Sequence, residues 1–398
     1  MTIYLDNNAT TRVDERVFSE MVPFLTAFYG NPSSMHSFGG QVAKAIQTAR
    51  EQVADLIGAL PSEIVFTSCG TEGNNTAIRS ALATQSDRKH IITTQVEHAC
   101  VLNLCKALEK QGYRVTYLSV DRNGMLDLME LEAALTGDTA IVSTMYANNE
   151  TGVIFPVEQI GALAKSYGVL FHVDAVQAVG KIPINLQNSS IDFLTLSGHK
   201  FHAPKGVGAL FVRKGVRLRP LLIGGHQERN RRGGTENVAG IVGLGQAALL
   251  AKQYLGQMQS VQALRDYLET SILRTIPDTV VNGQGSPRLP NTTNIGFKYI
   301  EGEAILLLLD REGICASSGS ACTSDSLEPS HVLRAMGLPY SVLHGSIRFS
   351  LSRFTTREEV DRLLEVMPRI VSHLRSLSPF SSDEGEWLQE RTAALIPA

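Results

Sequence analysis

Short apolar runs alternate with helix-length amphipathic stretches through much of the chain. Seven runs rich in β-branched residues fall between residues 63 and 212: EIVFT, HIITT, RVTYLSV, AIVSTMY, VLFHVD, FLTLS and GALFV. Helical patterns such as NTAIRSALA and VEQIGALAKSYG separate some of them, and a further helix is expected across residues 241–258. Apolar strands that alternate with helices predict an α/β fold, with a mostly parallel seven-stranded sheet flanked by helices.

The pattern changes after about residue 256. The helical ALRDYLETSILRTI is followed by TTNIGFKY, EAILLLLDREG and SIRFSLS, and then by the helical EEVDRLLEVMPRIVSHLRSL, which together predict a smaller α+β domain. The expected large domain spans residues 13–256, and the small domain combines residues 1–12 with 257–380. Residues 381–398 are polar at first and are expected to form a loosely ordered tail.

Composition narrows the function classes. The chain has 398 residues, 43% of them hydrophobic, and a formal net charge of -3, so it offers no broad basic face for nucleic acid. Its first residues lack the cationic start and apolar stretch of a secretory signal. The densest apolar run, AILLLL at 304–309, is too short to cross a bilayer and indicates a buried strand or helix segment. We therefore expect a soluble, cytoplasmic protein that binds neither nucleic acid nor membrane.

Five cysteines are few and odd in number for this length. They show no C-x-x-C spacing, which argues against both a disulfide framework and a structural zinc site. Cys100 and Cys105 lie in a helical pattern and are expected in the core. Cys322 differs, because its motif SSGSACTS surrounds it with hydroxyl groups, a glycine and an alanine, and offers nothing to bury it.

Two predicted strands end in residues that carry chemistry. VLFHVDAVQ places Asp174 at a strand end with Gln177 just beyond, and open parallel sheets bind ligands outside the carboxyl ends of their strands. Asp174 is therefore either a helix cap or a site residue. FLTLSGHKFHAPKG leads into Lys200, which is either a solvated lysine or one that forms a Schiff base. His199 and His202 lie nearby, but without a third ligand they make a weak metal site.

A third strand end resembles a phosphate-binding loop. In TSCGTEGNNTAIRSAL, residues 69–71 follow the strand EIVFT and open a helix, where an ordinary helix cap is the alternative interpretation. Pyridoxal phosphate requires a lysine for covalent attachment, an acid for its ring nitrogen and a phosphate cradle. The three strand ends together match these requirements.

The motifs also occur in a familiar order. YLDNNATT, GNPSS, FTSCGTE, VEH, NNETG, HVDAVQ, SGHK, GHQERNRRGGTEN, SSGSACTS and SIRFSLSR resemble those of the NifS/IscS family of cysteine desulfurases, which are fold-type-I pyridoxal-phosphate enzymes of the class V aminotransferase group. The resemblance runs from about residue 3 to 380. SCGTE, GHKFHAPKG and GHQERNRRGGTEN are most similar to the nitrogen-fixation branch, whereas SSGSACTS is shared with the housekeeping branch.

The resemblance implies roles for the residues that match the family's motifs. Lys200 would hold the cofactor as an aldimine, Asp174 would pair with the ring nitrogen, Gln177 would bond the ring hydroxyl, and His98 would stack on the ring and move protons. The phosphate would be held by a further set: Gly70, Thr71, Ser197, Gly198, His199 and, from the neighbouring subunit, Thr235. A homodimer follows from that last contact.

The remaining residues that match the family's motifs would bind the substrate and accept its sulfur. Asn149 would lie beside the ring and substrate, and Arg348 would clamp the substrate carboxylate, which suits the fork of a guanidinium group. Cys322 would accept the sulfur of L-cysteine as a persulfide, and would act as a transient iron–sulfur ligand. Taken singly, His98 is more often a core histidine, Arg348 a solvated charge and Asn149 a turn residue.

The implied function is the conversion of L-cysteine to L-alanine, with sulfur passed to a scaffold or other acceptor protein for iron–sulfur clusters, and a link to those of nitrogenase is expected. A housekeeping desulfurase, a selenocysteine lyase, a cystathionine-type lyase or a small-amino-acid aminotransferase are the alternative enzymes. A scaffold that binds sulfur or iron without catalysis is an alternative of another class, which loss of Lys200 or Asp174 would mark; both residues are present.

Overall fold

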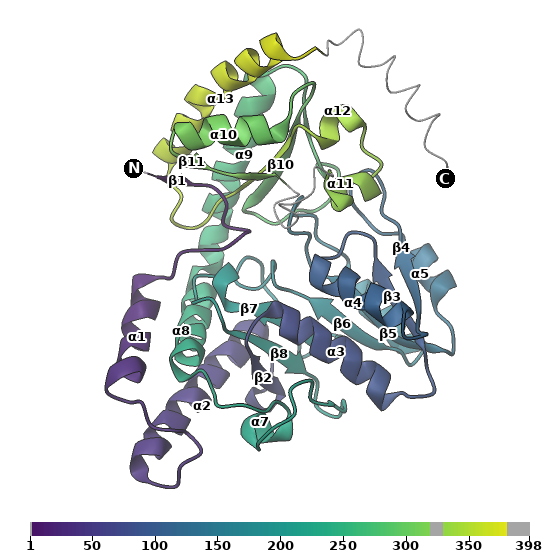
Figure 1. Ribbon diagram of the computed structural model, residues 1–398, viewed down its shortest axis with the longest axis vertical. Coiled ribbons are helices and arrows are strands. Elements are labelled where there is room, and N and C mark those ends of the chain that lie inside the picture. Colours follow the sequence, from purple (N-terminus) through teal and green to yellow (C-terminus); the bar gives the residue numbers. More distant parts are fainter. Residues whose placement is uncertain (1, 319–328, 380–398) are drawn as a thin grey trace.

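The computed structural model describes residues 2–318 and 329–379. Figure 1 shows two bodies, a lower one built on a large sheet and an upper one built on a small sheet, with α8 and α9 running between them. Cys322 and the tail 381–398 lie outside the described residues. The domain boundaries expected from the sequence stay a prediction.

Each of the seven apolar runs forms a strand of the lower sheet. The strand order is β2-β8-β7-β6-β5-β3-β4. The strands are β2 (Ile64–Thr67), β3 (His90–Thr94), β4 (Arg114–Leu118), β5 (Thr139–Met145), β6 (Leu170–Asp174), β7 (Phe193–Ser197) and β8 (Gly208–Val212). β8 is antiparallel to both of its neighbours and the other pairs are parallel, so the mostly parallel α/β sheet is confirmed.

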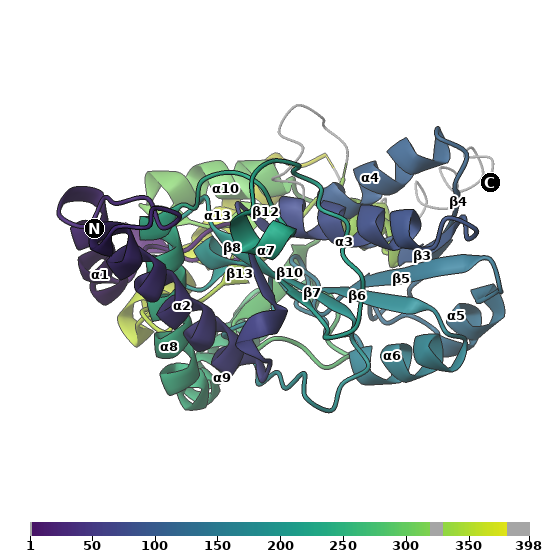
Figure 2. The same cartoon turned by 90° about the horizontal axis from the view of Figure 1, so that it is seen from below.

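Helices cover both faces of this sheet, as Figure 2 shows for α3 and α4 on one side and α5 and α6 on the other. Successive strand residues therefore pack in opposite directions. Phe193 belongs to the cluster with α3 and α4, whereas its neighbour Leu194 belongs to the cluster that includes α2, α6 and α8. This double burial explains why the strands are apolar without alternation. The helices of the lower body are α1 (Glu15–Thr26), α2 (Ser37–Ile57), α3 (Gly70–Thr84), α4 (Ala99–Glu109), α5 (Leu128–Ala134), α6 (Val157–Ser166), α7 (Gln227–Asn230) and α8 (Val238–Tyr254), with the 3₁₀ turns η1 (Pro61–Glu63) and η2 (Gly198–Lys200).

Helix α8 packs closely on α2. A Cβ at Gly245 would lie 2.5 Å from Cα of Ala49, so only glycine allows this approach. Through η3 (Leu255–Gln257), α8 leads into α9 (Met258–Thr275), and the segment Val238–Thr275 is long and apolar enough to cross a membrane by length and composition. Of its apolar 18-residue stretch, 56% is buried inside the protein. We therefore interpret the segment as a core helix of this fold.

The upper body has its own core around a four-stranded antiparallel sheet in the order β12-β13-β10-β9. Its elements are β9 (Thr279–Val281), β10 (Thr292–Phe297), α10 (Gly302–Arg311), β11 (Ile314–Cys315), β12 (Ser317–Ser318), α11 (His331–Ala335), α12 (Tyr340–Leu343), β13 (Ser346–Ser350) and α13 (Arg357–Leu377). The apolar run AILLLL lies in α10. The N-terminal β1 (Ile3–Tyr4) pairs with β11, so the chain begins in the upper body and then enters the lower one.

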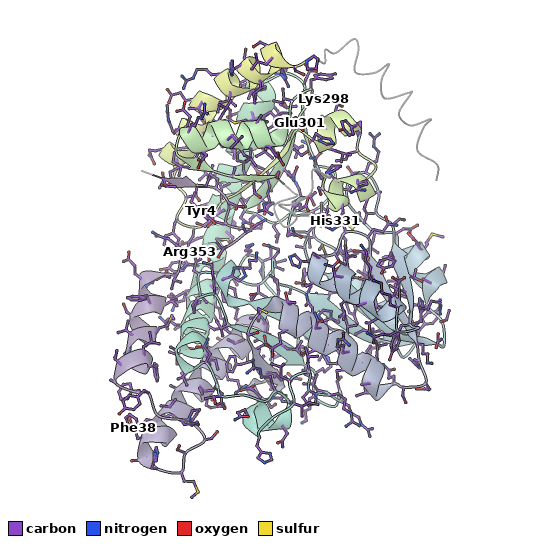
Figure 3. The ribbon with its side chains drawn as sticks, viewed as in Figure 1. Tyr4, Phe38, Lys298, Glu301, His331 and Arg353 are labelled. Atoms are coloured by element: carbon purple, nitrogen blue, oxygen red, sulfur yellow. The ribbon has the colours of Figure 1, made fainter. Side chains whose placement is uncertain are left out.

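Tyr4, His331 and Arg353 lie along the boundary between the two bodies (Figure 3). The imidazole Nε2 of His331 lies 2.9 Å from the backbone oxygen of Glu97, and Arg353 donates to the carboxylate of Asp14 at 2.6 Å. Side chains of the upper body thus bond groups of the lower one.

Candidate active site

The strand ends singled out in the sequence meet at one edge of the large sheet. β6 and β7 are parallel, and β2 runs in the direction of β7 because β8 is antiparallel to both. A Cβ at Gly70, the first residue of α3, would lie 2.8 Å from Cγ2 of Val176 and 3.7 Å from Cβ of Ser197. The start of α3 therefore lies directly against the ends of β6 and β7.

Asp174 accepts hydrogen bonds both from its own turn and from helix α3. Its Oδ1 accepts a hydrogen bond from the backbone N–H of Val176 at 3.0 Å, and its Oδ2 accepts one from Nδ2 of Asn74 at 2.6 Å. Asn74 lies on α3, so Asp174 ties the phosphate-type loop to the end of β6. Nothing in its local sequence indicates a role for Asn74, because its partner Asp174 lies 100 positions further along the chain.

His98 precedes α4 and shares an electrostatic environment with Asp174 and Lys200. Its Nδ1 accepts from the backbone N–H of Cys100 at 3.2 Å, so a neutral ring carries its proton on Nε2. Burial lowers the pKa of His98 from its ordinary value, the charge of Asp174 opposes this, and that of Lys200 adds to it. The fold therefore brings these three predicted residues together.

Lys200 closes the turn η2 after β7 and reaches the N-terminal segment. Its Nζ donates to the backbone oxygens of Asn8 at 2.6 Å and Ala9 at 2.8 Å. The adjacent His199 has its Nδ1 at 3.1 Å from Oγ1 of Thr10, and burial followed by the charge of Lys200 lowers the pKa of His199 to about 4. At neutral pH His199 is thus an uncharged hydrogen-bonding group.

Gln177 and Arg348 approach the same region from different elements. Gln177 donates through Nε2 to the backbone oxygen of Asn8 at 3.0 Å. Arg348, on β13 of the upper body, donates to the backbone oxygen of Asn149 at 3.0 Å and to Oδ1 of Asp6 at 2.7 Å. Its Nε is buried without a hydrogen-bond partner among the described residues, so the guanidinium retains donor capacity for an anion.

Two buried carboxyl groups that the sequence did not single out flank the site. Burial raises the pKa of Glu97 to about 8, while hydrogen bonds from Thr94 and the backbone of Met145 oppose the shift. Burial also raises the pKa of Glu150 to about 7, against a bond from Ser330 and the charge of Arg348. Each lies next to a predicted residue, but nothing in its local sequence distinguishes it from a solvated acid.

Thr71 and Thr235 are exposed. Thr235 lines a pocket of about 110 Å³ with Ser68, Arg232 and Glu236.

Cys322 lies outside the described residues. Burial raises the pKa of Cys100 and Cys105 to about 12 each, and burial also raises that of Cys315. In the described ranges, no group of three or more His, Cys, Asp and Glu residues is placed to hold a metal ion.

The donor set fits pyridoxal phosphate. Within the described structure the side chain of the N-cap residue Cys69 makes no capping hydrogen bond, so the first N–H groups of α3 are left for an acceptor such as a phosphate. The Oδ1 of Asn74 and the Nε of Arg348 are buried without partners in the same described residues. Lys200 would supply the amine and Asp174 the acid that the cofactor requires.

Comparison with known proteins gives a consistent result. The model of the aminotransferase class V family matches residues 3–363. "Cysteine desulfurase 2" of Trichormus variabilis is 70% identical over 393 residues, covering 99% of each chain. "Cysteine desulfurase NifS" of Azotobacter vinelandii is 59% identical over 385 residues, covering 96% of each chain. A solved structure titled "NIFS-LIKE PROTEIN" superposes with a TM-score of 0.88 at 42% identity, over 94% of this chain and 100% of the other.

Proposed function

The chain belongs to the cysteine desulfurases, pyridoxal-phosphate-dependent enzymes of the class V aminotransferase family, and from this premise we propose how its residues convert L-cysteine to L-alanine. One observation carries the assignment of roles. Three separate elements bring His98, Asp174 and Lys200 close enough together that the charges of Asp174 and Lys200 act on the imidazole of His98.

We propose that Lys200 holds the cofactor covalently and, once substrate is bound, takes the proton from the substrate's Cα. When bound, pyridoxal phosphate supplies an electron sink for the carbanion at that carbon. Asp174 would pair with the ring nitrogen, and the hydrogen bonds that it accepts from Nδ2 of Asn74 and the backbone N–H of Val176 hold its carboxylate in position. In this proposal the Nε2 proton of His98, left free by the bond that Nδ1 accepts, would serve the reacting atoms.

Arg348 orients the substrate in this proposal. A cysteine carboxylate would bind the guanidinium at Nε and compete with Asp6 for the Nη2 edge. Asn149 binds the same guanidinium through its backbone oxygen and so keeps it directed toward the lower body. The clamp therefore depends on contacts from both bodies.

Sulfur transfer is assigned to Cys322, on its motif and the family. Its thiolate attacks the substrate sulfur, an S–S bond forms, and the substrate's C–S bond breaks. The electron pair of that bond stays on the substrate carbon, which takes a proton to give alanine. In total, L-cysteine and the thiol of Cys322 are consumed, alanine and a persulfide are formed, and no external oxidant is needed.

The test is an assay on purified enzyme loaded with its cofactor. L-Cysteine without any keto acid should give alanine and, in the presence of a reducing thiol, sulfide in equal amounts. A requirement for a keto acid would instead assign an aminotransferase. The same assay with L-selenocysteine separates a desulfurase from a selenocysteine lyase by the ratio of kcat/KM values.

We also propose that the enzyme is a homodimer in which Thr235 reaches the neighbouring cofactor's phosphate. Thr235 is exposed, which leaves it accessible to a second subunit. Large apolar side chains are exposed along α1 and the loop after it: Phe18 at 58%, Leu25 at 63% and Tyr29 at 75%. Apolar surface gathered in this way is typical of an interface. Sedimentation should give twice the chain mass of 43.2 kDa, and a monomer would contradict the proposal.

For the physiological role we propose sulfur supply to an iron–sulfur scaffold of nitrogenase assembly in the cytoplasm, with a housekeeping role as the alternative. Support comes from the relative of Azotobacter vinelandii that is named NifS. Nitrogenase assembly genes beside the gene for this chain would agree with the first role, and their absence would count against it.

A further inference from the structure

A second amine, that of Lys181, lies buried within the candidate site. Lys181 is 7% exposed and follows β6 in the turn that also carries Gln177. Its Nζ donates to Oε1 of Gln177 at 2.7 Å and to Oδ1 of Asn8 at 3.2 Å. Both acceptors are amide oxygens, so within the described residues these bonds bring no carboxylate to the amine. Burial lowers the pKa of Lys181 well below its ordinary value, and the charges of Lys200 and Arg348 add to the effect.

Burying an amine in this way is costly, and such groups persist where they have a specific role. The surrounding contacts show what the amine holds in place. The backbone oxygen of Asn8 accepts from both Lys200 Nζ, at 2.6 Å, and Gln177 Nε2, at 3.0 Å. Lys181 therefore bonds the side chains of the two residues that stand beside the cofactor lysine.

The direction of these bonds matters. A lysine amine acts here as a donor, so the amide atom that faces it is an oxygen, and the NH₂ group of Gln177 must point the other way. Asn8 is fixed in the same manner: its Oδ1 accepts from Lys181, and its Nδ2 donates to the backbone oxygen of Asn149 at 3.1 Å and to Thr292 at 2.9 Å. Both amides are thus held in one of their two orientations.

We propose that Lys181 is a positioning residue, which orients the Gln177 amide toward the cofactor and, through Asn8, the amine of Lys200. The proposal rests on the proposed role of Lys200 as the cofactor lysine. Lys181 itself does not touch the reacting atoms in this scheme; it determines which polar atom its neighbours present to them.

Replacing Lys181 with methionine tests this, because methionine keeps much of the chain length and cannot donate. Removing a hydrogen bond to a buried amide costs about 1 kcal/mol, which corresponds to roughly a fivefold rise in the dissociation constant for pyridoxal phosphate. The visible circular dichroism of the bound cofactor, which reports the setting of its ring, should also change per cofactor bound. Lys165→Met, an exposed lysine on α6, is the matched control and should change neither quantity.

A double-mutant cycle separates positioning from simple packing. If Lys181 acts through Gln177, Lys181→Met should weaken cofactor binding much less in a Gln177→Ala background than in the wild type. An undiminished effect in that background, or a lower melting temperature with unchanged dichroism and affinity, would overturn the inference. Should Lys181→Met fail to fold, Lys181→Leu removes the same donors with a smaller side chain; wild-type affinity and dichroism of this variant would equally overturn the proposal.

The outcomes also distinguish this inference from the proposed function. A wild-type enzyme with one cofactor bound at Lys200 supports the proposed function whatever the Lys181 variants do. If the wild type binds its cofactor and the Lys181 variants bind it equally well with the same dichroism, only the positioning role is ruled out. If the wild type binds no pyridoxal phosphate, both the positioning role and the proposed function are ruled out.

Discussion

Replacing Cys322 with alanine is expected to abolish persulfide formation while the cofactor stays bound. The thiolate that receives the sulfur is lost, and removal of a catalytic nucleophile costs on the order of a thousandfold or more in kcat. Cys322 is separate in sequence from Lys200, Asp174 and the start of α3, so cofactor absorbance per chain should match the wild type. Sulfide release from L-cysteine and mass spectrometry of the protein persulfide measure the effect.

Cys315 provides the matched control for that experiment. It lies at the end of β11, and burial, together with the charges of Asp310 and Asp6, raises the pKa of its thiol. A thiol of this kind is a poor nucleophile at neutral pH. Cys315→Ala should therefore remain active. Normal sulfide release by Cys322→Ala, or loss of activity in a well-folded Cys315→Ala, would show that the wrong cysteine was chosen.

Replacing Lys200 with alanine is expected to remove both covalent cofactor binding and catalysis. The visible band of the covalently bound cofactor should disappear, and kcat should fall by on the order of a thousandfold or more, since the attachment point and the base for the α-proton are one group. Absorbance after gel filtration and the alanine assay measure the two losses.

The fold of the Lys200 variant has to be checked separately, because Nζ bonds the backbone oxygens of Asn8 and Ala9. Far-ultraviolet circular dichroism and the melting temperature serve this purpose. Lys214→Ala, at an exposed lysine after β8, is the control and should retain the band and the activity. A Lys200 variant that keeps the covalent band would contradict the assignment.

The parts of the site carried by strand ends were predictable from the sequence. Asp174 and Ser197 end β6 and β7, Lys200 closes the turn η2 that follows β7, and Gly70 begins the helix α3 that follows β2. A parallel sheet places such ends at one edge whatever the details of packing, so the strand pattern alone brings these residues together. The motifs then indicated which chemistry the edge carries.

The residues that sequence reasoning missed are those whose partners are far away along the chain. The backbone oxygen of Asn8 accepts from Lys200 across 192 positions, and nothing in the local sequence around Asn8 indicates a lysine partner. Lys181 has the local appearance of a solvated lysine, yet it is buried between two amides. Burial depends on everything that packs around a group, and a short stretch of sequence does not contain that information.

By itself, then, the sequence determined the α/β class, the seven strands, the chemistry at the ends of β2, β6 and β7, and the family. It did so because strand propensity and the residue type at a strand end are local properties. Only the tertiary structure decided that the N-terminal segment returns to bind Lys200, that Arg348 crosses from the upper body to Asn149, and that Glu97 and Lys181 are buried beside them. These features arise from contacts between distant segments, where desolvation and neighbouring charges set the state of each group.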